Sequence, residues 1–218
     1  MTSGNHSHTS GKHGSYGTFI LVACCVAVHI ALIWLPQINL EWAFVAAAHY
    51  FSTGDAELLN RYLELQANTL GMSYLAYLVD TLLPGVDLYY IPRLLSISGI
   101  VLLGAALHNV ARLLALPMNT TALIALVLLN PLVWTFSGRG TADFLPAALA
   151  LFSLSWLLDS GRNQLSTAAA CVLLGVAITL KYHAAFLLPL LWLHALSQEN
   201  HSTDQLVSNL VNAGLKTA

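Results

Sequence analysis

Charged residues are the class that this sequence has least of. Asp, Glu, Lys and Arg make up 8% of its 218 residues, whereas about a quarter of the residues of soluble domains are charged. Hydrophobic residues account for 57%, and the mean hydropathy is +0.69. So few charges cannot cover a surface that faces water, which excludes an ordinary soluble globular domain. With eight Lys and Arg residues against ten Asp and Glu residues, we expect no nucleic-acid partner.

Cysteine is scarce as well. The three cysteines, Cys24, Cys25 and Cys171, all lie within apolar runs. We therefore interpret them as buried small apolar residues, and not as a disulfide or a metal-binding set.

Long apolar runs are what the sequence has in abundance. Residues 18–35 contain no charge and end before Pro36, and about 20 apolar residues are needed to cross a hydrocarbon core of about 30 Å. The sequence therefore predicts an all-α fold, a polytopic membrane bundle of about six transmembrane helices whose partner is the lipid bilayer. Further apolar runs lie at 94–107, 119–137, 144–158, 165–180 and 184–196.

Polar segments flank the predicted transmembrane module at residues 18–197. Residues 1–17 are rich in Ser, Gly and His without an apolar period, which predicts a disordered N-terminal tail. We interpret the run after it as a retained anchor, because no small-residue cleavage site of a secretory signal precedes Pro36. Residues 198–218 form a polar C-terminal segment.

Residues 36–88 form the one long polar-faced segment between predicted spans, and six of the ten acids lie there. Residues 41–54 favour a helix that stops at Gly54. Asp55 can then cap a second short helix. The apolar stretch at 70–85 is too short to span comfortably, so we expect it to lie in the membrane interface or to re-enter.

Four stretches, in their order and spacing, resemble the GT-C membrane glycosyltransferases, which include the protein mannosyltransferases and the bacterial aminoarabinose transferases. The resemblance implies sugar transfer from a polyprenyl-phosphate donor to an acceptor on the extracytoplasmic side, in a bacterial inner (plasma) membrane. It also implies a cytoplasmic N-terminus with residues 36–88 outside, since the equal division of Lys and Arg between the two sides decides nothing. The stretches are QINLEWAFVAAAHYFSTGD at 37–55, IPRLLSISGIVLLGAAL at 91–107, SGRGTADFLPAALALFSLSW at 137–156 and LKYHAAFLLPLLW at 180–192.

The resemblance assigns candidate catalytic residues. Glu41 corresponds to the acidic pair that follows the first span in the family, although the pair is reduced here to Leu40 and Glu41. Asp143 corresponds to a second acid at the start of the fourth span, and Lys181 to a lysine where the fifth span emerges. A carboxylate is useful as a base, since the acceptor hydroxyl must lose its proton during attack on the anomeric carbon.

Positive charge near the donor phosphate assists the departure of an anionic leaving group. Arg93, Arg139 and Lys181 fall at the same predicted membrane face as the two carboxylates, and we expect them to bind the phosphate. The cofactor is not determined by the sequence. A divalent metal held by either carboxylate, with His49 or His183 as co-ligand, is one option.

Each candidate also has a structural interpretation. Glu41 could be a first-turn acid that complements the helix dipole, Asp143 could form an ion pair with Arg139, and Lys181 could extend to the membrane surface to mark a helix end. At the level of the whole chain the alternative is a transporter-like or non-catalytic membrane protein. The grouping of the charges at one face, and not through the middle of the spans, favours the transferase.

GT-C enzymes usually continue with further spans and often a soluble C-terminal domain. We therefore expect this chain to be an N-terminal module, truncated after residue 218 and inactive by itself.

Overall fold

The computed structural model describes residues 10–36, 39–65, 69–116, 119–131, 143–159, 164–190 and 193. Every regular element among these residues is a helix, which confirms the all-α prediction. The elements are α1 (Ser10–Ala31), α2 (Asn39–Thr53), α3 (Ala56–Leu65), α4 (Gly71–Leu82), α5 (Ile91–Leu113), α6 (Thr120–Leu128), α8 (Phe144–Leu158), α9 (Gln164–Leu180) and the 3₁₀ helix η1 (Tyr182–Leu187).

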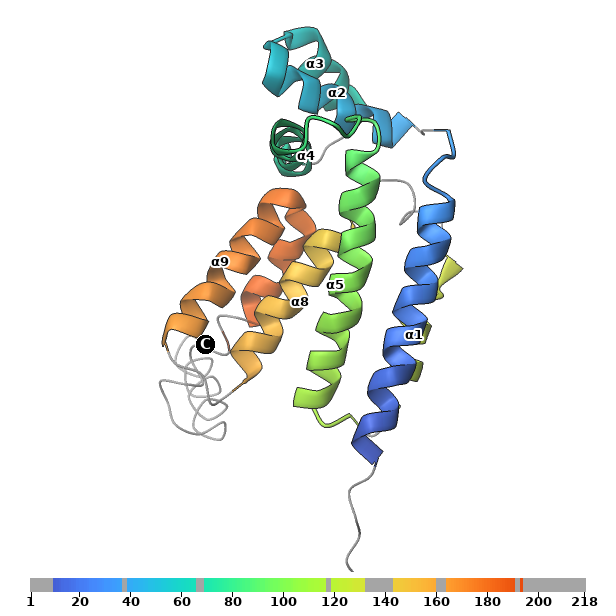
Figure 1. Cartoon of the computed structure of the whole chain (residues 1–218). Helices are drawn as coiled ribbons and strands as arrows, with labels where there is room; N and C mark the ends of the chain where they lie inside the picture. The colour runs from blue at the N-terminus through green and yellow to red at the C-terminus, as the bar shows by residue number, and fades with distance from the viewer. Residues whose placement is uncertain are drawn as a thin grey trace, which may run out of the picture.

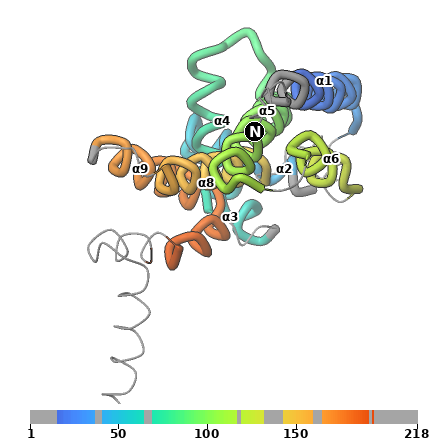
Figure 2. The backbone as a smooth tube through the Cα atoms, turned by 90° about the horizontal axis from the view of Figure 1, so that it is seen from below, coloured from blue at the N-terminus to red at the C-terminus, as the bar shows by residue number. Residues whose placement is uncertain are grey.

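The long helix α5 is the centre of the molecule (Figure 1). It contacts α1 and α6 on one side and α8 on the other, and α9 packs against the far side of α8. Seen along the bundle, α9, α8, α5 and then α1 with α6 follow one another across the molecule (Figure 2). Helices α2, α3 and α4 lie together at the end of the bundle where α5 begins.

Among the described residues, α5 is the one helix whose length and hydropathy suit a membrane span. Its 23 residues have a mean hydropathy of 1.8 over the most apolar window, of which 44% is buried in the protein. At 1.5 Å per residue the helix is about 35 Å long. Three shorter apolar helices accompany it, at Tyr16–Ala31, Phe144–Leu158 and Leu165–Leu180.

Helical structure occurs in each of the six predicted runs, but the boundaries differ. Helix α1 begins at Ser10, inside the segment predicted as a disordered tail, because extending an existing helix costs far less than starting one. It ends at Ala31, and turns follow up to Pro36. The sixth run begins with the 3₁₀ helix η1. Residues 1–9, residues 132–137 of the third run and residues 194–218 lie outside the described residues.

The two short helices predicted in the polar segment between α1 and α5 are present. Gly54 ends α2 with φ +74°, a backbone conformation that residues with a Cβ rarely adopt. Asp55 then caps α3, since its Oδ1 accepts the amide of Glu57 at 2.9 Å. The third helix of this segment is α4, within the predicted 70–85.

Among the described residues four regions of core hold these parts together, and the two largest lie in the bundle and at the end of the bundle where α5 begins. The core of the bundle joins α1, α5, α6 and α8, and Cys25 belongs to it as predicted, whereas Cys24 and Cys171 are exposed; all three cysteines are free. A second region of core joins α2, α3 and α4, the three helices at the end of the bundle where α5 begins, which we call the outer helices. Small side chains of α2 allow close packing there around one buried tyrosine. The members of this second region are Ala43, Phe44, Ala47, Tyr62 and Met72.

Candidate functional site

Glu41 and Arg93 form a buried ion pair at the junction of α2 and α5. Arg93 donates from Nε to Oε1 of Glu41 at 2.7 Å and from Nη2 to Oε2 at 3.0 Å. Each side chain is 1% exposed. Two parallel bonds of this kind give the geometry of a bidentate arginine–carboxylate pair.

The guanidinium of Arg93 also binds the backbone just after α1. Its Nη1 donates to the carbonyl of Ile33 and, at 2.6 Å, to that of Leu35. The ring of Tyr89 lies 5.4 Å from the guanidinium carbon. One arginine in the first turn of α5 therefore ties together the chain leaving α1, the start of α2 and the segment before α5.

This geometry bears on the roles predicted for the pair. Both oxygens of Glu41 accept from Arg93, and neither side chain is open to a substrate in this arrangement. A base must lie within hydrogen-bond reach of the proton that it removes. Catalysis by Glu41 and phosphate binding by Arg93 stay predictions, and both require the pair to open.

Asp143 and Lys181 form a second ion pair, between the residue before α8 and the residue after α9. Nζ of Lys181 donates to Oδ1 of Asp143, and the side chains are 21% and 41% exposed for Lys181 and Asp143 respectively. Lys181 has an extended backbone, φ −155° and ψ +117°, which turns the chain out of α9 before η1 begins. Unlike the pair at Arg93, this one is accessible.

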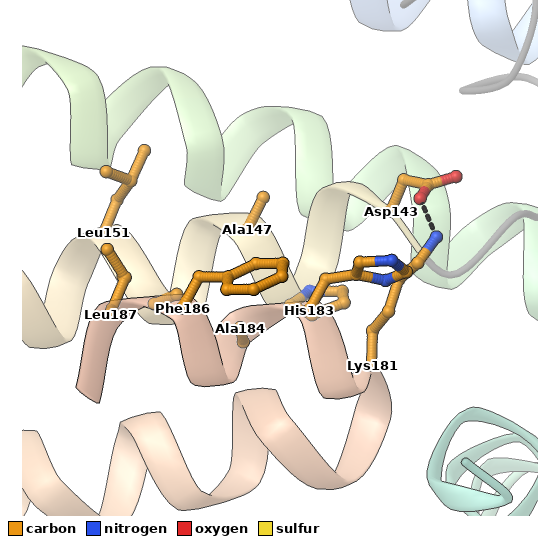
Figure 3. Close-up of a pocket in the computed structure, with 10 residues that line it drawn as sticks. Asp143, Ala147, Leu151, Lys181, His183, Ala184, Phe186 and Leu187 are labelled. Atoms are coloured by element: carbon orange, nitrogen blue, oxygen red, sulfur yellow. Dashed lines mark hydrogen bonds and ion pairs between the residues drawn. The ribbon is translucent and has the colours of Figure 1, made fainter. Parts of the chain in front are cut away.

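The accessible pair lies at one end of a pocket of about 500 Å³ between α8 and η1. Figure 3 shows the two charges at one end, Leu151 and Leu187 at the other, and the ring of Phe186 between them. The pocket thus has one charged end and apolar walls. Its lining residues are Asp143, Pro146, Ala147, Ala150, Leu151, Lys181, His183, Ala184, Phe186 and Leu187.

The two histidines proposed as metal co-ligands lie in different places. His183 lines the pocket and stacks on Tyr182, with ring centroids 4.1 Å apart. His49 is exposed on α2. No group of three or more His, Cys, Asp or Glu residues able to hold a metal ion occurs in the described part of the chain. The described residues therefore do not form a protein cage of three or more such ligands.

The structure thus groups the predicted residues into two sets, Glu41 with Arg93 and Asp143 with Lys181 and His183. Arg139 lies outside the described residues, so its predicted roles stay untested. Sequence reasoning missed the pairing of Asp143 with Lys181, although opposite charges at the start of one span and the end of the next could have suggested it. The apolar walls below the charges were missed too, because a lining leucine is indistinguishable from a core leucine in sequence.

One titratable group of the outer helices has a pKa that departs from its ordinary value. Tyr62 is fully buried between α2, α3 and α4, and burial raises its pKa to about 12. Its hydroxyl donates to the carbonyl of Thr69 at 2.7 Å, just before α4. The tyrosine therefore anchors the loop that leads into α4.

Comparison of the chain with protein-family models, with curated proteins and with solved structures finds no match.

Proposed function

We propose that the chain is a multi-pass integral membrane protein. In this proposal α1, α8 and α9 cross the bilayer beside α5, and so does the apolar run at 119–137 to which α6 belongs. The support is the exposure of large apolar side chains around the bundle, which in water would promote aggregation. Helices α8 and α9 have 15 and 17 residues, and at about 23–26 Å they can span a bilayer that thins locally. Such side chains include Phe19 (72% exposed), Leu126 (71%), Leu165 (77%) and Val172 (66%).

We further propose that the protein is a glycosyltransferase of the GT-C type, which takes its sugar from a polyprenyl-phosphate donor. The observation that carries this proposal is the pocket with its charged end and apolar walls. A lipid phosphate has a matching chemical layout, because its charged head is joined to an apolar hydrocarbon tail. Lys181 would bind the phosphate, and the wall that ends at Leu151 and Leu187 would contact the tail.

The proposed reaction needs one proton acceptor and one group that stabilises the leaving anion. The acceptor hydroxyl oxygen bonds to the anomeric carbon of the sugar, the bond from that carbon to the phosphate oxygen breaks, and the lipid phosphate leaves with the electron pair. The hydroxyl proton passes to Asp143. When the phosphate engages the ammonium of Lys181, that ammonium no longer occupies Oδ1 of Asp143, and the oxygen becomes available for the proton.

In this proposal Glu41 and Arg93 serve the site indirectly. Their buried pair holds the outer helices over the end of the bundle, since Arg93 bonds both to α2 and to the chain that follows α1. Arg139 is proposed as a further phosphate ligand from the resemblance. The bacterial inner membrane is the proposed location on the same ground.

Because we expect residues 1–218 to be inactive by themselves, the test uses a full-length form that contains this module, in lipid vesicles supplied with a panel of polyprenyl-phosphate sugars. Release of lipid phosphate is the readout. Asp143→Asn and Lys181→Met should each abolish most of the release while membrane insertion is retained. Asp80→Asn is the matched control, because Asp80 is an outer-segment acid that does not line the pocket, and it should leave the rate unchanged. Wild-type rates in both pocket variants would refute the proposed site.

A further inference from the structure

Gly71 brings the start of α4 into backbone contact with the end of α9. A methyl group at this position would overlap the carbonyl of Thr179 and stand 3.0 Å from the amide nitrogen of Leu180. Any residue larger than glycine would therefore force the two helix ends apart. Since Leu180 leads directly into Lys181, this contact fixes the point from which the lysine side chain starts.

Gly99 makes a similar close contact next to Asp143, the other member of the ion pair. It lies in α5, and a methyl group there would stand 2.5 Å from the amide nitrogen of Leu145 and 2.8 Å from Cβ of Phe144. These two residues open α8 and directly follow Asp143. The backbone of α5 therefore lies against the segment that carries Asp143.

From these two contacts we infer that Gly71 and Gly99 are positioning residues for the pair of Asp143 and Lys181. The distance between the two charges depends on where two helix ends lie, and each end is held by a backbone contact with no side chain able to rearrange. The contact at Gly71 is itself anchored, because Tyr62 donates to the carbonyl of Thr69 two residues earlier. The outer helices thus determine the position of Lys181, and α5 that of Asp143.

The importance of this placement for sugar transfer rests on the proposed function, whereas the placement itself can be measured without it. A carbodiimide joins a carboxylate to an amine as an amide only where the two groups touch. Coupling Asp143 to Lys181 in the membrane-embedded protein should give a linked pair of peptides, detected by mass spectrometry. Asp143→Asn should abolish this product, which identifies it.

The decisive variants are Gly71→Ala and Gly99→Ala. Each should lower the yield of the linked peptides several-fold while the protein stays folded by size-exclusion chromatography and thermal unfolding. Gly104→Ala is the matched control in the same helix as Gly99, because its methyl group would stand 2.6 Å from Cγ2 of Val22 on α1, away from the pair. Gly175→Ala controls for the substitution itself, since apart from its own chain neighbours and the adjoining backbone of its helix no described atom lies within 4 Å of its added methyl group.

Wild-type yields in the two decisive variants would overturn the inference, and so would an equal loss in Gly104→Ala. Because a backbone clash can also prevent folding, the yield is measured in Tyr62→Phe as well, which frees the loop before α4 but adds no atom. We expect the yield of linked peptides in Tyr62→Phe to lie between those of the wild type and the alanine variants. If the alanine variants fail to fold and Tyr62→Phe gives the wild-type yield, the inference is wrong. Absence of sugar transfer by the full-length form would refute the proposed function but would leave the linked peptides as they are.

Discussion

Arg93 donates hydrogen bonds to both carboxylate oxygens of Glu41 across the junction of α5 and α2, and both side chains are buried. The same guanidinium holds the carbonyls of Ile33 and Leu35. Two residues that are 52 positions apart in sequence thereby connect the chain leaving α1, the outer helices and α5. The pair is the connection that we expect to be most sensitive to substitution.

Removing one partner of the pair should be costly because it leaves the other charge buried and unpaired. We expect Glu41→Leu and Arg93→Leu each to lower the free energy of unfolding by about 3–5 kcal/mol. The double variant should lose clearly less than the sum of the two. Thermal or denaturant unfolding in detergent provides the measurement.

An exposed ion pair supplies the comparison for this prediction. Arg61 and Glu57 lie one helical turn apart on α3, with side chains 53% and 70% exposed. Arg61→Leu should change the free energy of unfolding by less than about 1 kcal/mol, as is usual for surface pairs. A loss at Glu41 no larger than that at Arg61 would show that the buried pair contributes little.

Stability should fall at alkaline pH through Tyr62. Its pKa is about 12 in the folded protein and 10.0 ordinarily, so the unfolded chain loses this proton first as pH rises. The contribution is fully present below about pH 10 and is lost as pH approaches 12, a change on the order of 2 kcal/mol in the free energy of unfolding.

Unfolding measured across this pH range in the wild type and in Tyr62→Phe tests the prediction. Tyr62→Phe should be less stable at neutral pH because it loses the bond to Thr69, and its alkaline decline should be shallower. Identical declines in the two proteins would assign the effect to other groups.

Gly54 should tolerate substitution poorly for a reason of backbone conformation alone. Its φ is +74°, and apart from its two chain neighbours no described atom lies within 4 Å of a methyl group added there. We expect Gly54→Ala to lower the free energy of unfolding by about 1 kcal/mol. Gly85→Ala is the control, because that position is equally open and lacks the positive φ, and equal effects at the two glycines would contradict this explanation.

The orientation of the chain can be tested by cysteine labelling. Asn60 is exposed on α3, so Asn60→Cys in a background without the three native cysteines gives a single site in the outer segment. An impermeant thiol reagent should label it in intact cells if residues 36–88 lie outside. Labelling that requires permeabilised cells would invert the proposed topology.

The sequence by itself determined the helical class, the approximate place of each helix and the local signals of the outer segment. Apolar runs long enough to form buried helices need no knowledge of their neighbours, and Gly54 and Asp55 act on the adjacent backbone, so these features were predictable. The grouping of charged residues near helix ends was also visible along the chain.

Only the tertiary structure decided which charge meets which. Glu41 meets Arg93 in a buried pair because α2 folds back over the start of α5, and Asp143 meets Lys181 because two antiparallel helices bring their ends together. The same holds for Gly71 and Gly99, whose sequence context resembles that of any helical glycine. Such contacts depend on the packing of segments that are distant in sequence, and a one-dimensional pattern does not encode how helices are arranged around one another.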